Sequence, residues 1–162
     1  MSITVGSKLP PATLLQIGGN GPETIALTDK LVDRKVVIFG LPGAYTGTCT
    51  SAHVPSFIRT KAEFEKKGVD EIICISVNDP FVMKAWAETT GAKAAGLTML
   101  ADPAATFTKS VGMNFTAEPV GFYDRSKRYA LYAEDGIVKV FHPEESPGTC
   151  EISGGEALLA AI

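Results

Sequence analysis

The sequence contains little that would support a secreted or metal-binding protein. Only three of its 162 residues are cysteine, and Cys49, Cys74 and Cys150 form no Cys-x-x-Cys pair. Small secreted domains depend on several disulfides, and structural zinc sites need cysteines or histidines at short spacing, so both classes are disfavoured. The three thiols are therefore better interpreted as individual groups, each with its own environment.

Long apolar runs and an excess of basic charge are also missing. No stretch approaches the roughly 20 apolar residues of a membrane-spanning helix, and residues 1–6 lack the charged and then apolar pattern of an export signal. The net charge is −3, with 15 basic and 18 acidic residues, so nothing favours nucleic-acid binding. We therefore expect a cytoplasmic protein with neither a membrane nor a nucleic acid as partner.

The length and the order of predicted elements indicate one α/β domain over residues 1–162. Two short strands are expected around a loop at 18–22, and Asn78 or Asp79 is expected to cap a helix that follows the second buried strand. This order is typical of a thioredoxin-like fold, a central mixed β-sheet flanked by helices. The main predictions are buried strands at 35–39, 71–77 and 97–100, helices at 49–66, 102–111 and 155–162, and a hairpin over 128–141 with an Asp-Gly turn.

Cys49 has the most informative position in the chain. The β-branched strand at 35–39 is stopped by Gly40 and Pro42, and apolar residues at three-to-four spacing predict a helix over 49–66. The thiol thus lies beyond the carboxyl end of a central strand and at the amino end of a helix, where unpaired N–H groups favour a thiolate. An ordinary thiol, with a pKa of about 8.5, is only a few per cent ionised at pH 7. This position therefore indicates a chemically reactive thiol. A single cysteine near the start of a helix is by itself, however, more often an unreactive residue of the hydrophobic core.

The segment around Cys49 resembles the peroxiredoxins. Their pattern Pro-x-x-x-Thr-x-x-Cys is met by Pro42, Thr46 and Cys49, and the wider run PGAYTGTCTSAHVPSF is similar to the type II, or Prx5-like, subgroup, although many members have Phe at Tyr45 and Pro at Gly47. Three more segments resemble that subgroup in the same order, namely ISVNDPFVM (75–83), LADP (100–103) and KRYA (127–130). The resemblance therefore covers nearly the whole chain.

The resemblance implies a thiol-dependent peroxidase that uses no metal, haem, flavin or other cofactor. Cys49 would attack hydrogen peroxide or a small alkyl hydroperoxide and become a sulfenic acid. Thr46, which would otherwise simply cap the helix, would place its hydroxyl beside the sulfur and the peroxide, and Pro42 would shield the pocket. Arg128 would supply the positive charge. Arg125 lies close by, and only the subgroup's pattern of arginine before an aromatic strand residue selects Arg128.

The remaining thiols and His53 have less specific signals. Cys74 stands in an apolar run and is expected to be a buried spectator. Cys150 lies in the turn-rich segment 147–151, where it resembles the resolving thiol of two-cysteine members. Other members depend on an external thiol, so thioredoxin and glutaredoxin with glutathione both stay open as reductants. His53, one helical turn after Cys49, either contacts the active-site region or packs at the pocket rim.

Other functions for this sequence stay open. A thiol-disulfide oxidoreductase on the same fold is disfavoured because Cys49 has no Cys-x-x-Cys partner, and a cysteine hydrolase using His142 has no supporting motif. A non-enzymatic alternative is a peroxide-sensing redox protein, in which oxidation of Cys49 changes a partner surface. The resemblance also implies a homodimer formed through the loops at 45–48 and 79–81.

Overall fold

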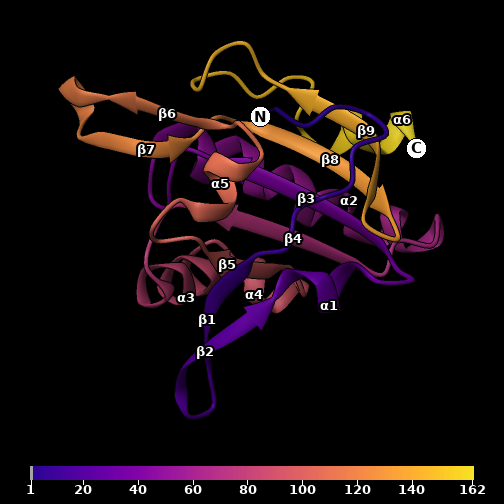
Figure 1. The fold of residues 1–162 in the computed structure, drawn as a ribbon, viewed down its shortest axis with the longest axis horizontal. Helices are drawn as coiled ribbons and strands as arrows, with labels where there is room; N and C mark the ends of the chain where they lie inside the picture. The colour runs from indigo at the N-terminus through magenta and orange to yellow at the C-terminus, as the bar shows by residue number, and fades with distance from the viewer. Residues whose placement is uncertain (1) are drawn as a thin grey trace.

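The computed structural model describes residues 2–162. Its main element is a seven-stranded sheet in the order β2-β1-β5-β4-β3-β8-β9 (Figure 1). The three inner strands β5, β4 and β3 are parallel, whereas the pairs β1–β2 and β8–β9 are antiparallel, so the sheet is mixed, as predicted. The strands are β1 (Thr13–Gly18), β2 (Gly21–Ala26), β3 (Lys35–Leu41), β4 (Glu71–Ser76), β5 (Thr98–Ala101), β8 (Tyr129–Glu134) and β9 (Ile137–Pro143).

Helices cover both faces of the sheet because side chains alternate along its buried strands. In β3, Val37 and Phe39 pack with α2, α3, α4 and α6, whereas Val36 and Ile38 pack with α1 and α5 on the other face. Apolar layers therefore pack on both faces of β3, the central strand that leads into the Cys49 loop. The helices are α1 (Leu27–Leu31), α2 (Val54–Lys66), α3 (Pro80–Thr89), α4 (Ala92–Ala95), α5 (Thr106–Ser110) and α6 (Gly155–Ala161), with a π-helical turn η1 (Cys49–His53) and a 3₁₀ turn η2 (Glu118–Val120).

Most predicted elements are confirmed. The Asp135-Gly136 turn of the late hairpin has φ angles of 50° and 75°, which is the left-handed backbone that such a tight hairpin requires. Asp79 caps α3 by accepting a hydrogen bond from the Val82 N–H at 2.9 Å. In the early hairpin the strands extend further than predicted, and only residues 19 and 20 form the turn.

Two regions differ from the prediction. The helix predicted over 102–111 is shorter, because the Asp102 carboxylate accepts the N–H groups of Phe107 and Thr108 and so begins α5 late, after Ala105 at a φ of 58°. The segment before Arg128, predicted only as polar, forms a second, two-stranded sheet of β6 (Asn114–Ala117) and β7 (Phe122–Ser126). This hairpin projects from the main body (Figure 1) and becomes part of the site described below.

Candidate active site

Cys49 begins the π-helical turn η1, which continues directly into α2. The helix predicted over 49–66 is thus present, but its first turn is wider than an α-helical one. π turns are rare and frequently mark functional sites. The loop from Pro42 to Thr48 connects this turn to the end of β3, and the thiol is completely buried. The fold therefore holds Cys49 at a defined point beneath the protein surface.

Arg128 lies against the thiol. It stands just before β8 and is only 2% exposed, and its Nη2 donates to Cys49 Sγ at 3.2 Å. Its Nε and Nη2 also donate to the Pro147 carbonyl oxygen at 3.2 and 2.9 Å, and its Nη1 is 2.9 Å from His53 Nδ1. Among residues 2–162 no carboxylate lies within ion-pair distance of this guanidinium. A buried charge without a carboxylate needs another partner, and a thiolate at Cys49 would supply it.

The other residues expected in the site have different partners. Thr46 does not cap the helix, because its hydroxyl donates to the Gly43 carbonyl oxygen at 2.6 Å. Arg125 stays away from the thiol and donates from Nη1 to the Pro42 carbonyl oxygen at 2.9 Å, with its guanidinium 5.0 Å from the centre of the Phe122 ring. Arg125 therefore anchors the Pro42 loop, while Arg128 is the arginine beside Cys49.

A cavity of about 280 Å³ opens above this cluster. Its walls come from the loop that contains Pro42 and Thr46, from the β6–β7 hairpin and η2, and from the segment after β9. Because a water molecule occupies about 30 Å³ of liquid, the cavity suits a small substrate. It is lined by Pro42, Thr46, Gly47, Thr48, Val120, Phe122, Arg128, Pro147 and Gly148.

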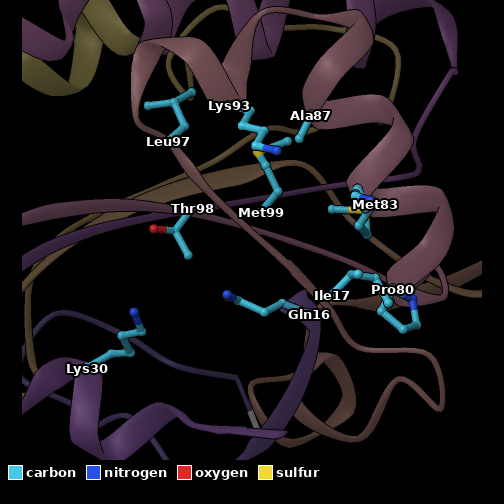
Figure 2. A pocket seen from close by; sticks show the side chains of 11 residues that line it. Gln16, Ile17, Lys30, Pro80, Met83, Ala87, Lys93, Leu97, Thr98 and Met99 are labelled. Carbon is cyan, nitrogen blue, oxygen red and sulfur yellow. The ribbon is translucent and has the colours of Figure 1, made fainter. Parts of the chain in front are cut away.

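Another cavity, of about 250 Å³, lies between α3 and the β1 and β5 strands (Figure 2). Lys30, Lys93 and Gln16 are at its rim, and Met83 and Met99 provide apolar surface. None of its lining residues forms a hydrogen bond with a cysteine sulfur, whereas Arg128, which lines the first cavity, donates to Cys49 Sγ. Within residues 2–162 no three His, Cys, Asp or Glu side chains gather closely enough to hold a metal ion. In the same residues no helix is both long and apolar enough to span a membrane.

His53 is not at the pocket rim but completely buried beneath Arg128. Its Nε2 is 2.9 Å from the Ser153 carbonyl oxygen, and its Nδ1 faces Arg128. Burial, together with the charge of Arg128, lowers the pKa of His53 to about 3 despite the opposing effect of the Ser153 hydrogen bond. The sequence placed His53 on the helix face of Cys49, but only the tertiary contacts show that it bonds to the arginine.

The segment between β9 and α6 covers the site and contains Cys150. The Glu144 side chain holds this segment in a compact conformation. Its Oε2 accepts hydrogen bonds from the Glu151 N–H at 2.7 Å and from the Ser153 N–H and hydroxyl at 2.8 and 2.6 Å. Burial alone would raise the pKa of Glu144, but these bonds outweigh burial and lower it. Thr48 ties the segment to the active-site loop by donating to the Gly148 carbonyl oxygen at 2.9 Å.

The two other cysteines have different environments. Cys74 is completely buried in β4, as expected, and burial raises its pKa. Cys150 is half-buried and has Ser153 Oγ at 4.0 Å, and burial raises its pKa as well. All three thiols are free in this structure.

Comparisons with known proteins identify the family of this chain. The Redoxin family matches residues 4–159. The chain is 42% identical to the chloroplastic Peroxiredoxin-2E-2 of Oryza sativa subsp. japonica, over 99% of this chain and 73% of that protein. It is 44% identical to the mitochondrial Peroxiredoxin-2F of Arabidopsis thaliana, over 86% of this chain and 69% of that protein. The structure of reduced Prx3 from Vibrio vulnificus in complex with H2O2 superposes with a TM-score of 0.91, at 40% identity and 98% coverage of both chains. The chain therefore belongs to the peroxiredoxin family, in its type II subgroup, and is a thiol-dependent peroxidase.

Proposed function

We propose that Cys49 is the peroxide-reacting thiol and that Arg128, Thr46 and Pro42 complete its site. The Cys49 thiolate attacks one oxygen of the peroxide ROOH, so that an S–O bond forms as the O–O bond breaks. Cysteine is oxidised to the sulfenic acid, and the released alkoxide or hydroxide takes up a proton to become an alcohol or water. The observation that carries this assignment is the contact of buried Arg128, which has no carboxylate partner among residues 2–162, with the Cys49 sulfur.

The three supporting residues act on different parts of the reaction. The fixed donors of Arg128 stabilise the thiolate before the attack and the negative charge on the departing oxygen during it. Thr46 lines the cavity, and its hydroxyl oxygen can accept a hydrogen bond from the peroxide while the hydroxyl proton remains donated to the Gly43 carbonyl oxygen. Pro42 has no N–H to attract water to the pocket wall, and Arg125 holds its carbonyl in place.

The size of the cavity favours hydrogen peroxide and small alkyl hydroperoxides as substrates. The walls leave about 280 Å³, which is slightly smaller than most ligand pockets, whose volumes begin at about 300 Å³. The structure of the similar Prx3 from Vibrio vulnificus in complex with H2O2 supports the same choice. The reaction needs no cofactor in this proposal, since the thiol itself carries the two electrons. A thiol-disulfide oxidoreductase is not favoured.

Cys150 is the proposed resolving thiol. It would attack the Cys49 sulfenic sulfur, forming a disulfide and releasing water, and an external dithiol would then reduce the bond. Peptide mapping after one equivalent of peroxide should show a Cys49–Cys150 bridge, with a loss of two hydrogens from the intact protein. Cys150→Ser should instead gain one oxygen and lose most of its thioredoxin-supported turnover.

The competing cycle uses Cys49 alone, with glutathione and glutaredoxin attacking the sulfenic acid directly. Turnover of Cys150→Ser with thioredoxin and then with glutathione and glutaredoxin separates the two cycles, and Cys74→Ser is the matched control. Unchanged thioredoxin-supported turnover of Cys150→Ser, with no bridged peptide in the wild type, would rule out the resolving role.

A homodimer through the active-site loops is the proposed assembly. Tyr45 and Phe81 are 53% and 63% exposed, and Val120 and Tyr123 on the β6–β7 hairpin are exposed to a similar degree. Covering these side chains would remove apolar surface from water. Light scattering of the reduced protein should give twice the chain mass of 17.1 kDa.

A charge at this surface should separate the subunits. Phe81→Glu is expected to give a monomer, whereas Val32→Glu, at a 55% exposed position after α1, should leave the dimer intact. If the wild-type protein stays monomeric at high concentration, the proposed interface is refuted, but the proposed chemistry is not affected.

Two broader predictions remain part of the proposal. We expect residues 1–162 to act as a single domain, because both apolar layers pack on the same sheet. The cytoplasmic location stays a prediction, since the relatives described above are named as chloroplastic and mitochondrial.

A further inference from the structure

The proposed chemistry requires the guanidinium plane of Arg128 to be fixed, and the hydrogen bonds of Arg128 show which groups fix it. An arginine side chain has five N–H donors in a rigid fork. Two of them meet the Pro147 carbonyl oxygen and one meets Cys49 Sγ. The fourth contact, from Nη1 to His53 Nδ1 at 2.9 Å, is on the other branch of the fork. His53 is thus the one side chain besides Cys49 that accepts from this group among residues 2–162.

We propose that His53 is a positioning residue, whose neutral ring holds Arg128 so that Nη2 faces the Cys49 sulfur. This inference rests on the roles proposed above for Cys49 and Arg128. His53 does not line the cavity, and its polar contacts are with Arg128 and Ser153. It therefore acts on the reaction through the arginine rather than on the peroxide.

The two partners of the ring determine its tautomer. The Ser153 carbonyl oxygen can only accept a hydrogen bond, so Nε2 must carry a proton. The Arg128 guanidinium can only donate, so Nδ1 must offer a lone pair. Only a neutral imidazole protonated at Nε2 satisfies both partners. The pKa of about 3 agrees with this geometry, because it keeps the ring neutral at any pH at which the thiol chemistry operates.

Packing prevents the ring from leaving this orientation. The ring centres of Phe39 and Phe57 lie 4.9 and 5.7 Å from that of His53, and all three side chains are completely buried. Rotation of the imidazole would break both of its hydrogen bonds within this apolar layer. The acceptor for Arg128 Nη1 is therefore fixed in space before any substrate arrives.

Ser153 connects the same ring to the segment that contains Cys150. The N–H and hydroxyl of Ser153 bond to Glu144, while its carbonyl oxygen accepts from His53. His53 therefore has two separable contacts, one to Arg128 and one to the covering segment. An experiment must break each contact alone.

A matched pair of substitutions can separate the two contacts. The amide of asparagine reaches the position of Nδ1, so His53→Asn can keep the acceptor for Arg128 while losing the bond to Ser153. The amide of glutamine reaches the position of Nε2, so His53→Gln can keep the bond to Ser153 while losing the acceptor for Arg128. Each variant would be compared with wild type for the rate of Cys49 oxidation by H2O2 in a single turnover, for the pH profile of Cys49 alkylation by iodoacetamide, and for thermal stability.

We expect His53→Gln to lose about 10- to 100-fold in oxidation rate, because a small displacement of a catalytic donor can have an effect of that size. Its alkylation profile should move to higher pH. His53→Asn should stay within about threefold of wild type and keep the wild-type profile, since the acceptor is retained. His142→Gln, the control for the other histidine, should change neither measurement. In an Arg128→Ala background His53→Gln should cause no further loss, because its effect passes through the arginine.

Equal rates for the two His53 variants, or rates that simply follow their thermal stability, would overturn the proposal. If both variants fail to fold, ¹⁵N NMR of the wild-type histidines still decides it. We expect His53 to be protonated at Nε2 alone, with no titration between about pH 5 and pH 8. The opposite tautomer, or a titration in that range, would also refute the proposal. Failure of the peroxidase chemistry is recognised separately, because the wild-type protein itself would then leave H2O2 unreduced.

Discussion

Cys49→Ser is expected to abolish peroxide reduction, because it removes the nucleophile and no other thiol can replace it. Cys74 is completely buried in β4, where burial raises its pKa, and Cys150 is in the segment between β9 and α6, where burial also raises its pKa. Only Cys49 has the guanidinium of Arg128 against its sulfur. Stopped-flow measurement of H2O2 consumption, with a recycling thiol present, gives the rate directly.

Cys74→Ser is the matched control, since it makes the same chemical change at another buried cysteine. We expect it to keep most of the wild-type rate, apart from the effect of placing a hydroxyl in an apolar strand. Retained turnover in Cys49→Ser would contradict the assignment of the reacting thiol. Loss of turnover in Cys74→Ser at unchanged stability would show that a second cysteine takes part.

Arg128→Ala is expected to lower the rate of Cys49 oxidation on the order of 10² to 10³, the usual result of removing a fixed donor from a charge-stabilising site. Arg128→Lys should lose a substantial part of the rate but less than the alanine variant. Lysine restores a positive charge but not the planar fork, so it cannot reach Cys49, Pro147 and His53 together. Single-turnover oxidation by H2O2 measures both variants.

Arg125→Ala is the control for this prediction. Arg125 donates to the Pro42 carbonyl oxygen but does not contact the thiol, so we expect a smaller loss from a loosened loop. A slower rate for Arg125→Ala than for Arg128→Ala would mean that the wrong arginine has been assigned. Circular dichroism of each variant distinguishes a loss of chemistry from a loss of structure.

Local patterns were sufficient for most of the secondary structure. The β-branched run that begins at Lys35 predicts a buried strand because such a strand needs apolar side chains on both faces, and β3 is that strand. The Asp135-Gly136 turn and the Asp79 cap could be predicted for a similar reason, since each depends on the geometry of a few adjacent residues. The β6–β7 hairpin could not, because its strands are short, partly exposed and separate from the main sheet.

The candidate site likewise has features that the sequence could predict and features that it could not. The sequence by itself determined the family to which the chain belongs and the strand-loop-helix setting of Cys49, and it predicted Cys49 as the reacting cysteine, because these depend on residues close together in the chain. It could not determine which groups surround the thiol. Arg128 is 79 residues from Cys49, and His53 is 100 residues from Ser153.

Only the tertiary structure decided that His53 bonds to Arg128, that Arg125 holds Pro42, and that Pro147 and Gly148 of the covering segment form one wall of the cavity. These contacts result from the pairing of β8 with β3 and from the packing of the segment after β9 over η1. Hydrogen-bond partners are chosen by distance and orientation in space, and a linear sequence contains neither until the sheet brings its distant strands together.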